Sequence, residues 1–281
     1  MRYGRTPEVG CRNLRGCERR TALRIGIVSD IPCDVVAFKR ALEELGQIDM
    51  ILGAGDWVLQ YRFSNEIYDM IRDYNIIAVR GNHDMAVAGP GGVMLRASGK
   101  INAENLEFLN NMPAVVELHI EGKRLLMMHT SRLDPTGGGR DLGGAAMGKV
   151  VHHYRENGGS FGQISADEAL NAGNSILTDN YVMGINAKPT NPGQVFIVAQ
   201  DDGFKEHNMG ELPEVDADIL VVGHTHQPVI DQQGTRLVVN PGSLGQPRNP
   251  AFPHRRTYAI LDTKDWSATI GEFHQQTYDE S

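Results

Sequence analysis

Five short segments of this 281-residue chain carry side chains that bind divalent metals well, and each of them follows a run of apolar residues. The segments are Asp30, Gly55-Asp56, Gly81-Asn82-His83-Asp84, His129 and Gly223-His224-Thr225-His226. Carboxylates, an amide oxygen and imidazoles form a mixed oxygen and nitrogen set that suits Mn, Fe, Zn or Ni. The residue types therefore predict a shared metal site, provided that the fold brings the five segments together.

Each segment also has a simpler interpretation when it is taken alone. A Gly-Asp pair is more often a turn than a ligand, Asn-His-Asp can cap a helix, and a single histidine such as His129 can pack in a core. The glycines before Asp56, Asn82 and His224 permit sharp turns, and an extended His-x-His projects both imidazoles to the same side. Five such elements in order, each after a predicted strand, favour one common site over scattered turns and caps.

The elements that must position these residues alternate between strands and helices. Apolar runs predict strands, and helical spacing of apolar residues predicts helices. Asn102 is the expected cap of the third helix, and Glu121-Gly122 the turn of a hairpin. The expected strands are 23–28, 50–52, 76–79, 114–120, 125–129, 219–222, 237–239 and 258–261, and the expected helices are 34–46, 64–74 and 103–111. This order predicts an α/β fold, in which ligands bind beyond the carboxyl ends of the strands.

Residues 131–213 lack this regular pattern, because clusters of glycine interrupt it. We expect helices over 145–156, carrying His152-His153, and over 165–172, where Ser165 and Glu168 have the spacing of a capping box. Residues 195–199 are expected to form a strand. Because a structureless loop of this length is unusual in a compact domain, we predict an insertion at about 131–213 that forms a subdomain or lid.

The bulk properties exclude several classes of protein. A formal net charge of −8 argues against a general nucleic-acid surface, and no segment approaches the roughly 20 apolar residues of a membrane span. Three cysteines are too few for a disulfide framework and fit a cytoplasmic setting. Residues 1–22 are rich in arginine and lack the apolar core of a secretory signal. We expect a disordered, basic extension there, or a start codon placed too early, rather than a binding arm.

The ordered metal-binding segments are similar to the signature of the calcineurin-like metallophosphoesterases. The run Asn240-Pro241-Gly242-Ser243-Leu244-Gly245-Gln246-Pro247-Arg248 also resembles the small prokaryotic branch of that family. The resemblance covers about 24–130 and 215–262. It implies a metallophosphoesterase domain over 23–281, built as a four-layer α/β/β/α sandwich with two divalent metal ions at one edge of its central sheets.

The resemblance also assigns roles to individual residues. It makes Asp56 the carboxylate that bridges the two ions. One ion would also bind Asn82, His129 and His224. The other ion would also bind Asp30 and His226.

The implied activity is hydrolysis of a phosphomonoester or phosphodiester by a metal-activated hydroxide. His83 would lie beside the substrate, where it stabilises charge or protonates the leaving oxygen, and Asp84 would orient its ring. The residue type of Arg248 leaves two roles open: its guanidinium can face the phosphate of a small phosphorylated substrate, or it can stabilise the turn that contains it. The sequence does not define the substrate or the oligomeric state.

One position departs from the family pattern Asp-x-His, because Pro32 stands where the histidine is expected. Water or substrate can take the place of the lost ligand, Cys33 or Asp34 can move in, or only the other ion can bind. We expect a weakened site that still binds two ions. The substitution also raises the alternative that the protein is a catalytically impaired binding or scaffold member of the family.

Overall fold

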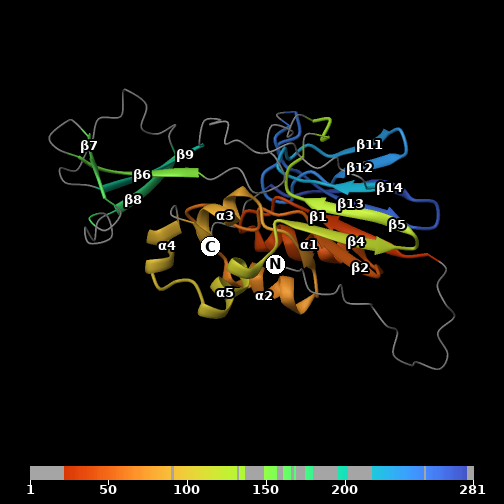
Figure 1. Cartoon of the computed structure of the whole chain (residues 1–281), viewed down its shortest axis with the longest axis horizontal. Helices are drawn as coiled ribbons and strands as arrows, with labels where there is room; N and C mark the ends of the chain where they lie inside the picture. Colours follow the sequence, from red (N-terminus) through yellow and green to blue (C-terminus); the bar gives the residue numbers. More distant parts are fainter. Residues whose placement is uncertain are drawn as a thin grey trace.

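The structure is a computed structural model of the whole chain (Figure 1). The residues that it describes are 22–89, 92–131, 133–136, 149–156, 161–165, 168, 175–179, 195–201, 217–249 and 251–276. The expected extension therefore lies, apart from Ala22, outside the described residues.

The first sheet has five strands in the order β14-β13-β1-β2-β3. Strand β1 (Arg24–Val28) pairs in parallel with β2 (Met50–Gly53), which pairs in parallel with β3 (Ile77–Ala78). On its other side β1 pairs antiparallel with β13 (Arg255–Asp262), and β13 pairs with the edge strand β14 (Ser267–His274). The carboxyl ends of β1, β2 and β3 therefore share one edge of this sheet.

The second sheet also has five strands, in the order β11-β12-β10-β5-β4. Its central strand β10 (Ile219–Val221) is parallel to both β5 (Lys123–Met128) and β12 (Arg236–Asn240). The edge strands β4 (Val115–Ile120) and β11 (Val229–Gln233) pair antiparallel with β5 and β12. The expected hairpin is thus confirmed as β4 and β5.

Helices pack on the outer face of the first sheet (Figure 1). Within the described residues they are α1 (Val35–Leu45), α2 (Asn65–Asp73), α3 (Asn82–Ala88), α4 (Val93–Ala97) and α5 (Ala103–Asn111). Their buried side chains, such as Phe38, Ile67 and Leu109, join Val28 and Ile51 of the sheet in one apolar cluster. None of the helices in the described part of the chain combines the length and the apolar character that a membrane crossing requires.

A second apolar cluster fills the space between the two sheets. Ile25 and Ile27 of β1 contribute from one side, and Met127 of β5 and Val221 of β10 from the other. Burial of both faces explains why the central strands have continuous apolar runs instead of alternating ones. The expected α/β sandwich, with two sheets packed face to face, is confirmed, and in the described part of the chain the helices of the expected α/β/β/α layers cover the first sheet.

The expected helix over 145–156 is wrong for the described residues 149–156, which form strand β6 (Lys149–Glu156). This strand carries His152-His153 and pairs antiparallel with β9 (Val195–Asp201). The β-branched and aromatic residues of β6 favour an extended backbone, and pairing with β9 satisfies its main-chain groups. Residues 145–148 lie outside the described residues.

Strands β6 and β9 belong to a third sheet of four strands, with the order β7-β6-β9-β8. Strand β7 is Phe161–Ile164 and β8 is Ser175–Asp179. This sheet lies to one side of the two five-stranded sheets (Figure 1). The predicted strand over 195–199 is confirmed as β9, whereas the role of the insertion as a subdomain or lid stays a prediction.

Two expected helix caps have different outcomes. Ser165 and Glu168 form the reciprocal hydrogen bonds of a capping box, with the Ser165 hydroxyl 3.2 Å from the Glu168 amide; residues 169–172 lie outside the described part. Asn102 precedes α5 as expected, but its side chain makes no capping hydrogen bond. The backbone amide of Asn102 donates to Oδ1 of Asn65 at 2.9 Å, and this hydrogen bond connects the start of α5 to α2.

Candidate metal centre

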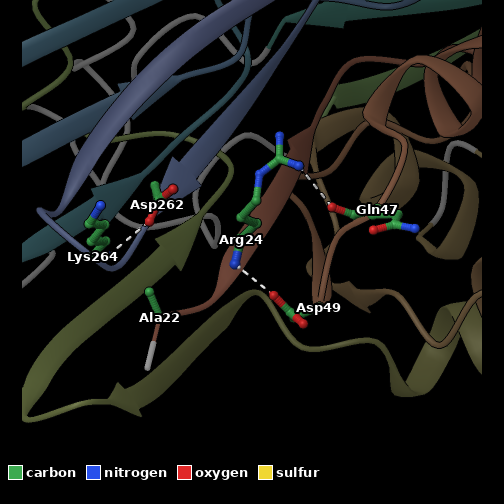
Figure 2. A pocket seen from close by; sticks show the side chains of 6 residues that line it. All are labelled: Ala22, Arg24, Gln47, Asp49, Asp262 and Lys264. Carbon is green, nitrogen blue, oxygen red and sulfur yellow. Dashed lines mark hydrogen bonds between the residues drawn. The ribbon is translucent and has the colours of Figure 1, made fainter. Parts of the chain in front are cut away.

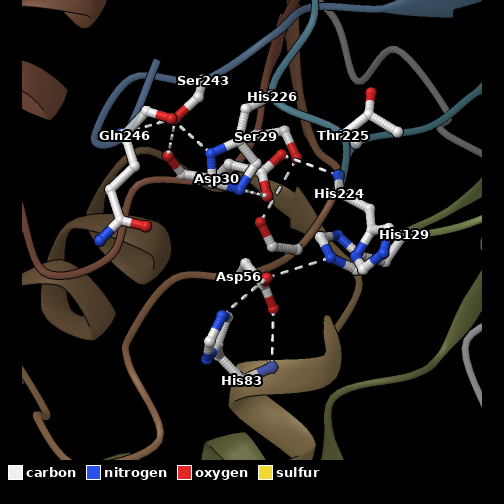
Figure 3. A network of polar contacts seen from close by, with 12 residues as sticks. Ser29, Asp30, Asp56, His83, His129, His224, Thr225, His226, Ser243 and Gln246 are labelled. Carbon is white, nitrogen blue, oxygen red and sulfur yellow. Dashed lines mark hydrogen bonds and ion pairs between the residues drawn. The ribbon is translucent and has the colours of Figure 1, made fainter. Parts of the chain in front are cut away.

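The loops after β1, β2, β3, β5 and β10 meet at one edge of the two sheets (Figure 3). The six residues predicted to bind metal come from these loops or, for Asn82, from the start of α3 directly after one of them, and they lie within one network of polar contacts. The pairs in contact are Asp56 with His129, Asn82 with His129, Asn82 with His224, and Asp30 with His226. The tertiary structure therefore brings all of the predicted ligands together.

The orientation of His129 is set by a backbone carbonyl. Its Nδ1 lies 2.6 Å from the carbonyl oxygen of Ala54, which can only accept a hydrogen bond, so Nδ1 carries the hydrogen. Its Nε2 points into the site, 3.1 Å from Oδ2 of Asp56 and 3.1 Å from Oδ1 of Asn82. This is the orientation in which a neutral imidazole presents its lone pair to a metal ion.

Asn82 and His224 complete this half of the site. Asn82 is the first residue of α3, and its Oδ1 lies 2.9 Å from Nδ1 of His224. One ligand atom from each of Asp56, His129 and His224 lies within 4.8 Å of the other two. With the amide oxygen of Asn82 these make four donors around one point, a set that fits a divalent ion.

Asp30 and His226 form the other half of the site. Nδ1 of His226 donates to the carbonyl oxygen of Gln246, so its Nε2 presents a lone pair toward Oδ1 of Asp30, 3.2 Å away. This Oδ1 is buried and accepts no hydrogen bond from the described residues. A buried carboxylate oxygen that faces an imidazole lone pair fits a bound cation.

Four of the six predicted ligands adopt strained backbone conformations. The φ angles are +54° at Asp30, +57° at Asp56, +69° at His224 and +60° at His226. Residues other than glycine seldom adopt such angles, and strain of this kind is concentrated at functional sites. At Gly81 a Cβ would collide with Oδ1 of Asp56, so the loop after β3 can approach Asp56 only because this residue is glycine.

The electrostatics of the site favour a positive charge between the carboxylates. Burial alone would raise the pKa of Asp56 and of Asp30, but the imidazoles of His129 and of His226 outweigh it and lower both pKa values. Burial alone would lower the pKa of His129, whereas the charge of Asp56 raises it to about 10. The pKa of His224 is lowered to about 4, mainly by burial and secondly by the charge on His129. Without a metal ion, the carboxylates therefore draw a proton onto His129.

His83 lies beside the carboxylate of Asp56. Its backbone amide donates to Oδ1 of Asp56 at 2.8 Å, and its Nε2 lies 3.8 Å from Oδ2. Its side chain is 16% exposed, in contrast to the 4% of Asp56. The imidazole therefore borders the site at a place that a substrate can reach.

The prediction that Asp84 orients the ring of His83 is wrong. The carboxylate of Asp84 accepts hydrogen bonds from the amides of Asp56 and Gly81, each at 2.8 Å. It also accepts from the amide of Trp57 at 3.1 Å and from the hydroxyl of Tyr68 at 3.3 Å. The pKa of Asp84 is raised to about 7, mainly by burial and secondly by the charge of Asp56. Asp84 thus fixes the backbone around Asp56, and it does not orient the imidazole of His83.

Pro32 belongs to a tight turn after β1. The amide of Asp34 donates to the carbonyl of Ile31 at 2.7 Å, and Cys33 has a φ of +65°. A proline at the second position and a positive φ at the third are the features of a type II turn. The proline ring packs so closely on Gly245 that a Cβ there would collide with it.

Neither neighbour of Pro32 replaces the lost histidine. Sγ of Cys33 is buried in the apolar cluster and donates to the carbonyl of Arg62 at 3.2 Å. The carboxylate of Asp34 caps α1 through the amide of Ala37 at 2.9 Å and accepts from Nε2 of Gln275. The interpretation in which Cys33 or Asp34 moves into the site is therefore wrong.

Arg248 is exposed in the loop after β12. Its positive charge is one of the causes that lower the pKa of His224, after burial and the charge of His129. Its role in binding phosphate stays a prediction.

The groups that hold the ligands in place were not predicted from the sequence. The carbonyls of Ala54 and Gln246 orient His129 and His226, and backbone carbonyls leave no signal in a sequence. Nδ2 of Asn240 donates to the carbonyl of Gly223 at 2.9 Å and to the hydroxyl of Thr225 at 3.0 Å, which holds the His-x-His turn. The position of Asn240 at the start of the Asn-Pro-Gly-Ser run could have indicated this role.

A pocket of about 230 Å³ lies at the opposite end of β1 (Figure 2). It is lined by Ala22, Arg24, Gln47, Asp49, Asp262 and Lys264. Its polar groups bind one another: the amide of Arg24 donates to Asp49 at 2.8 Å, and the amide of Lys264 to Asp262 at 2.9 Å. The pocket contains none of the predicted site residues.

Comparisons with known proteins agree with this geometry. Residues 23–154 and 190–266 match the model of the calcineurin-like phosphoesterase superfamily domain. The chain is 25% identical over 273 residues to an uncharacterized protein of Methanocaldococcus jannaschii, covering 88% of this chain and 85% of that protein.

Solved structures with a similar fold include the following two. A metallophosphoesterase from Sphaerobacter thermophilus has a TM-score of 0.53 at 21% identity, over 90% of each chain. A hypothetical protein from Pyrococcus horikoshii has a TM-score of 0.52 at 16% identity, over 92% of this chain and 89% of that one.

Proposed function

Because this chain belongs to the calcineurin-like phosphoesterase superfamily, we propose that it is a metal-dependent phosphoesterase that hydrolyses a phosphomonoester or phosphodiester. The observation that carries the proposal is the convergence of Asp56, Asn82, His129 and His224. Their donor atoms come from four separate loops and surround one point. A fold has little structural reason to gather two imidazoles and a carboxylate in this way unless they bind a cation.

The donors fit two divalent ions of the kind that carboxylates and imidazoles bind, such as Mn, Fe, Zn or Ni. When bound, such ions supply an activated water molecule and stabilise the charge on a phosphoryl group. Asp56 would contribute to both ions, with Asn82, His129 and His224 around one, and Asp30 and His226 around the other.

The chain itself contributes a candidate proton donor. The His83 imidazole sits 3.8 Å from the bridging carboxylate and is accessible from solvent. From there it can stabilise the negative charge of a phosphate or give a proton to the leaving oxygen. Asp84 keeps this arrangement rigid, because its carboxylate binds the amides of Asp56 and Gly81 on either side.

Arg248 is the candidate for substrate binding. A guanidinium matches the geometry of a phosphate group, and the lowered pKa of His224 reflects in part the charge of Arg248. We further propose that the insertion at about 131–213, whose described strands form a separate sheet, controls which phosphorylated compounds reach the site.

Hydrolysis of p-nitrophenyl phosphate and bis-p-nitrophenyl phosphate tests the proposal. Protein treated with a chelator should be inactive and should recover turnover with added Mn, Ni or Zn. Asp56→Asn should reduce turnover at least about 100-fold with an unchanged circular dichroism spectrum, whereas Asp73→Asn on the exposed side of α2 should have no effect. A folded, metal-loaded wild-type protein without turnover on either compound would contradict the proposal.

Pro32 supports a second candidate function, a metal-binding member of the family that recognises a phosphorylated partner without hydrolysing it. The turn around Pro32 supplies no side-chain ligand, because Cys33 and Asp34 are bound elsewhere. This candidate predicts metal binding by the same residues together with an absence of hydrolysis in every metal tested.

A further inference from the structure

We infer that the two metal positions of this chain are unequal, and that Pro32 is the cause. Asp56, Asn82, His129 and His224 hold one ion tightly, whereas Asp30 and His226 hold the second ion weakly and exchange it readily. This inference rests on the metal-dependent function proposed above, and it identifies what regulates that site.

The tight position is complete in the structure. Four side-chain donors point at one place, and Asp56, Asn82 and His129 are buried. His129 is fixed by the Ala54 carbonyl at 2.6 Å and Asp56 by the amide of His83 at 2.8 Å. Preorganised ligands of this kind bind an ion without a cost of rearrangement.

The weak position has fewer donors. Asp30 directs Oδ1 toward Nε2 of His226 at 3.2 Å. Its other oxygen, Oδ2, already accepts the amide of His224 at 2.9 Å. Besides the shared carboxylate of Asp56, this position therefore has one carboxylate oxygen and one imidazole from the described residues.

The loop after β1 cannot rearrange to add a ligand. Proline fixes its own φ, and Pro32 is packed on Gly245. The amide of Gly245 donates to the carbonyl of Asp30 at 2.9 Å, and its carbonyl accepts from the fully buried Arg256 at 2.6 Å. Contacts with the protein therefore fix the conformation of this loop.

The loss of one inner ligand should weaken binding at this position at least about tenfold relative to the complete one, since even outer ligand contacts are worth 10- to 100-fold. Occupancy of the second position then follows the free concentration of metal in solution. Activity should rise with that concentration well after the first ion is bound.

Titration with Mn²⁺ alone tests the inference without a substrate. Free Mn²⁺ gives an electron paramagnetic resonance signal that bound Mn²⁺ does not, so the titration counts bound ions and their affinities. We expect two classes, with one ion each and dissociation constants at least about tenfold apart. Pro32→His should strengthen the weak class at least about tenfold, and the matched control Pro32→Ala should leave it unchanged.

Two further variants assign the classes if Pro32→His does not fold. Asp30→Asn should remove the weak class and keep the tight one, and Asn82→Ala should weaken the tight class. Two equal classes, a single class unaffected by Asp30→Asn, or an equal gain in Pro32→Ala and Pro32→His would each overturn the inference. Unequal binding without hydrolysis would instead support the inference and refute the proposed enzyme.

Discussion

The side-chain oxygen of Asn82 lies 2.9 Å from Nδ1 of His224, although 142 positions separate the two residues in the chain. The same oxygen lies 3.1 Å from Nε2 of His129. Asn82 opens α3 beside the first sheet, whereas His129 and His224 follow strands of the second sheet. The site therefore exists only where the two sheets meet, and metal binding should report on their packing.

Replacing His83 with glutamine should lower turnover by about 100- to 1,000-fold, because the proton donor is lost. Metal binding should be unchanged, since the backbone amide of His83 still donates to Asp56. Steady-state hydrolysis and Mn²⁺ titration of the same sample measure the two properties. If metal binding fell together with turnover, His83 would be part of the metal site instead.

Replacing Asp84 with alanine should destabilise the protein by about 3 kcal/mol, because the buried amides of Asp56, Gly81 and Trp57 lose their acceptor. Urea unfolding measures this change in the free energy of unfolding. Glu107→Ala, on the exposed side of α5, is the control. It should change the free energy of unfolding by no more than about 0.5 kcal/mol. Equal effects of the two substitutions would show that Asp84 does not support the loop.

The metal-free protein should lose stability as the pH rises from about 7.5 to about 9.5. The pKa of His129 is raised from 6.5 to about 10 in the folded state. A raised pKa stabilises the protein fully below the unfolded value, and this contribution disappears as the pH rises through the folded value. The window lies above the pKa of Asp84, which is raised to about 7, so most of that group is already ionised at its lower end.

Urea unfolding in the presence of a chelator should show a decrease of about 1 kcal/mol per pH unit in this window. His129→Gln should remove this slope, because the titrating imidazole is absent. A slope that persists in the variant would assign it to another group.

Replacing Asn240 with alanine should weaken metal binding about tenfold and destabilise the fold by about 2 kcal/mol. Its amide group holds the carbonyl of Gly223 and the hydroxyl of Thr225, and it also donates to Oδ2 of Asp134 at 3.2 Å. Mn²⁺ titration and urea unfolding measure both effects, with the exposed Asn110→Ala as control. A loss of stability with unchanged metal affinity would limit Asn240 to a structural role.

Much of the fold followed from local patterns. Strands β1, β2, β10 and β13 were predicted to within three residues at each end, because buried central strands leave continuous apolar runs. Strands β11 and β14, at the edges of the sheets, were not predicted. Their exposed and buried residues alternate over polar sequences, and only pairing with β12 and β13 makes them strands.

Local composition was misleading for residues 149–156. Their spacing of apolar residues also fits a helix, and a short segment does not show which neighbour it will pair with. The hydrogen bonds between β6 and β9 decided in favour of a strand. Long-range pairing thus overrode a local preference that was weak.

The sequence alone determined which side chains can bind metal and that they follow the ends of strands, because residue type and strand position are local properties. Only the tertiary structure decided what each neighbouring group does. In the structure, Asp84 binds the backbone amide of Asp56 and not the ring of His83. Cys33 and Asp34 form hydrogen bonds with groups outside the site. Hydrogen-bond partners in a protein interior are chosen by three-dimensional proximity among competing donors and acceptors, and the distance between residues along the chain does not encode that choice.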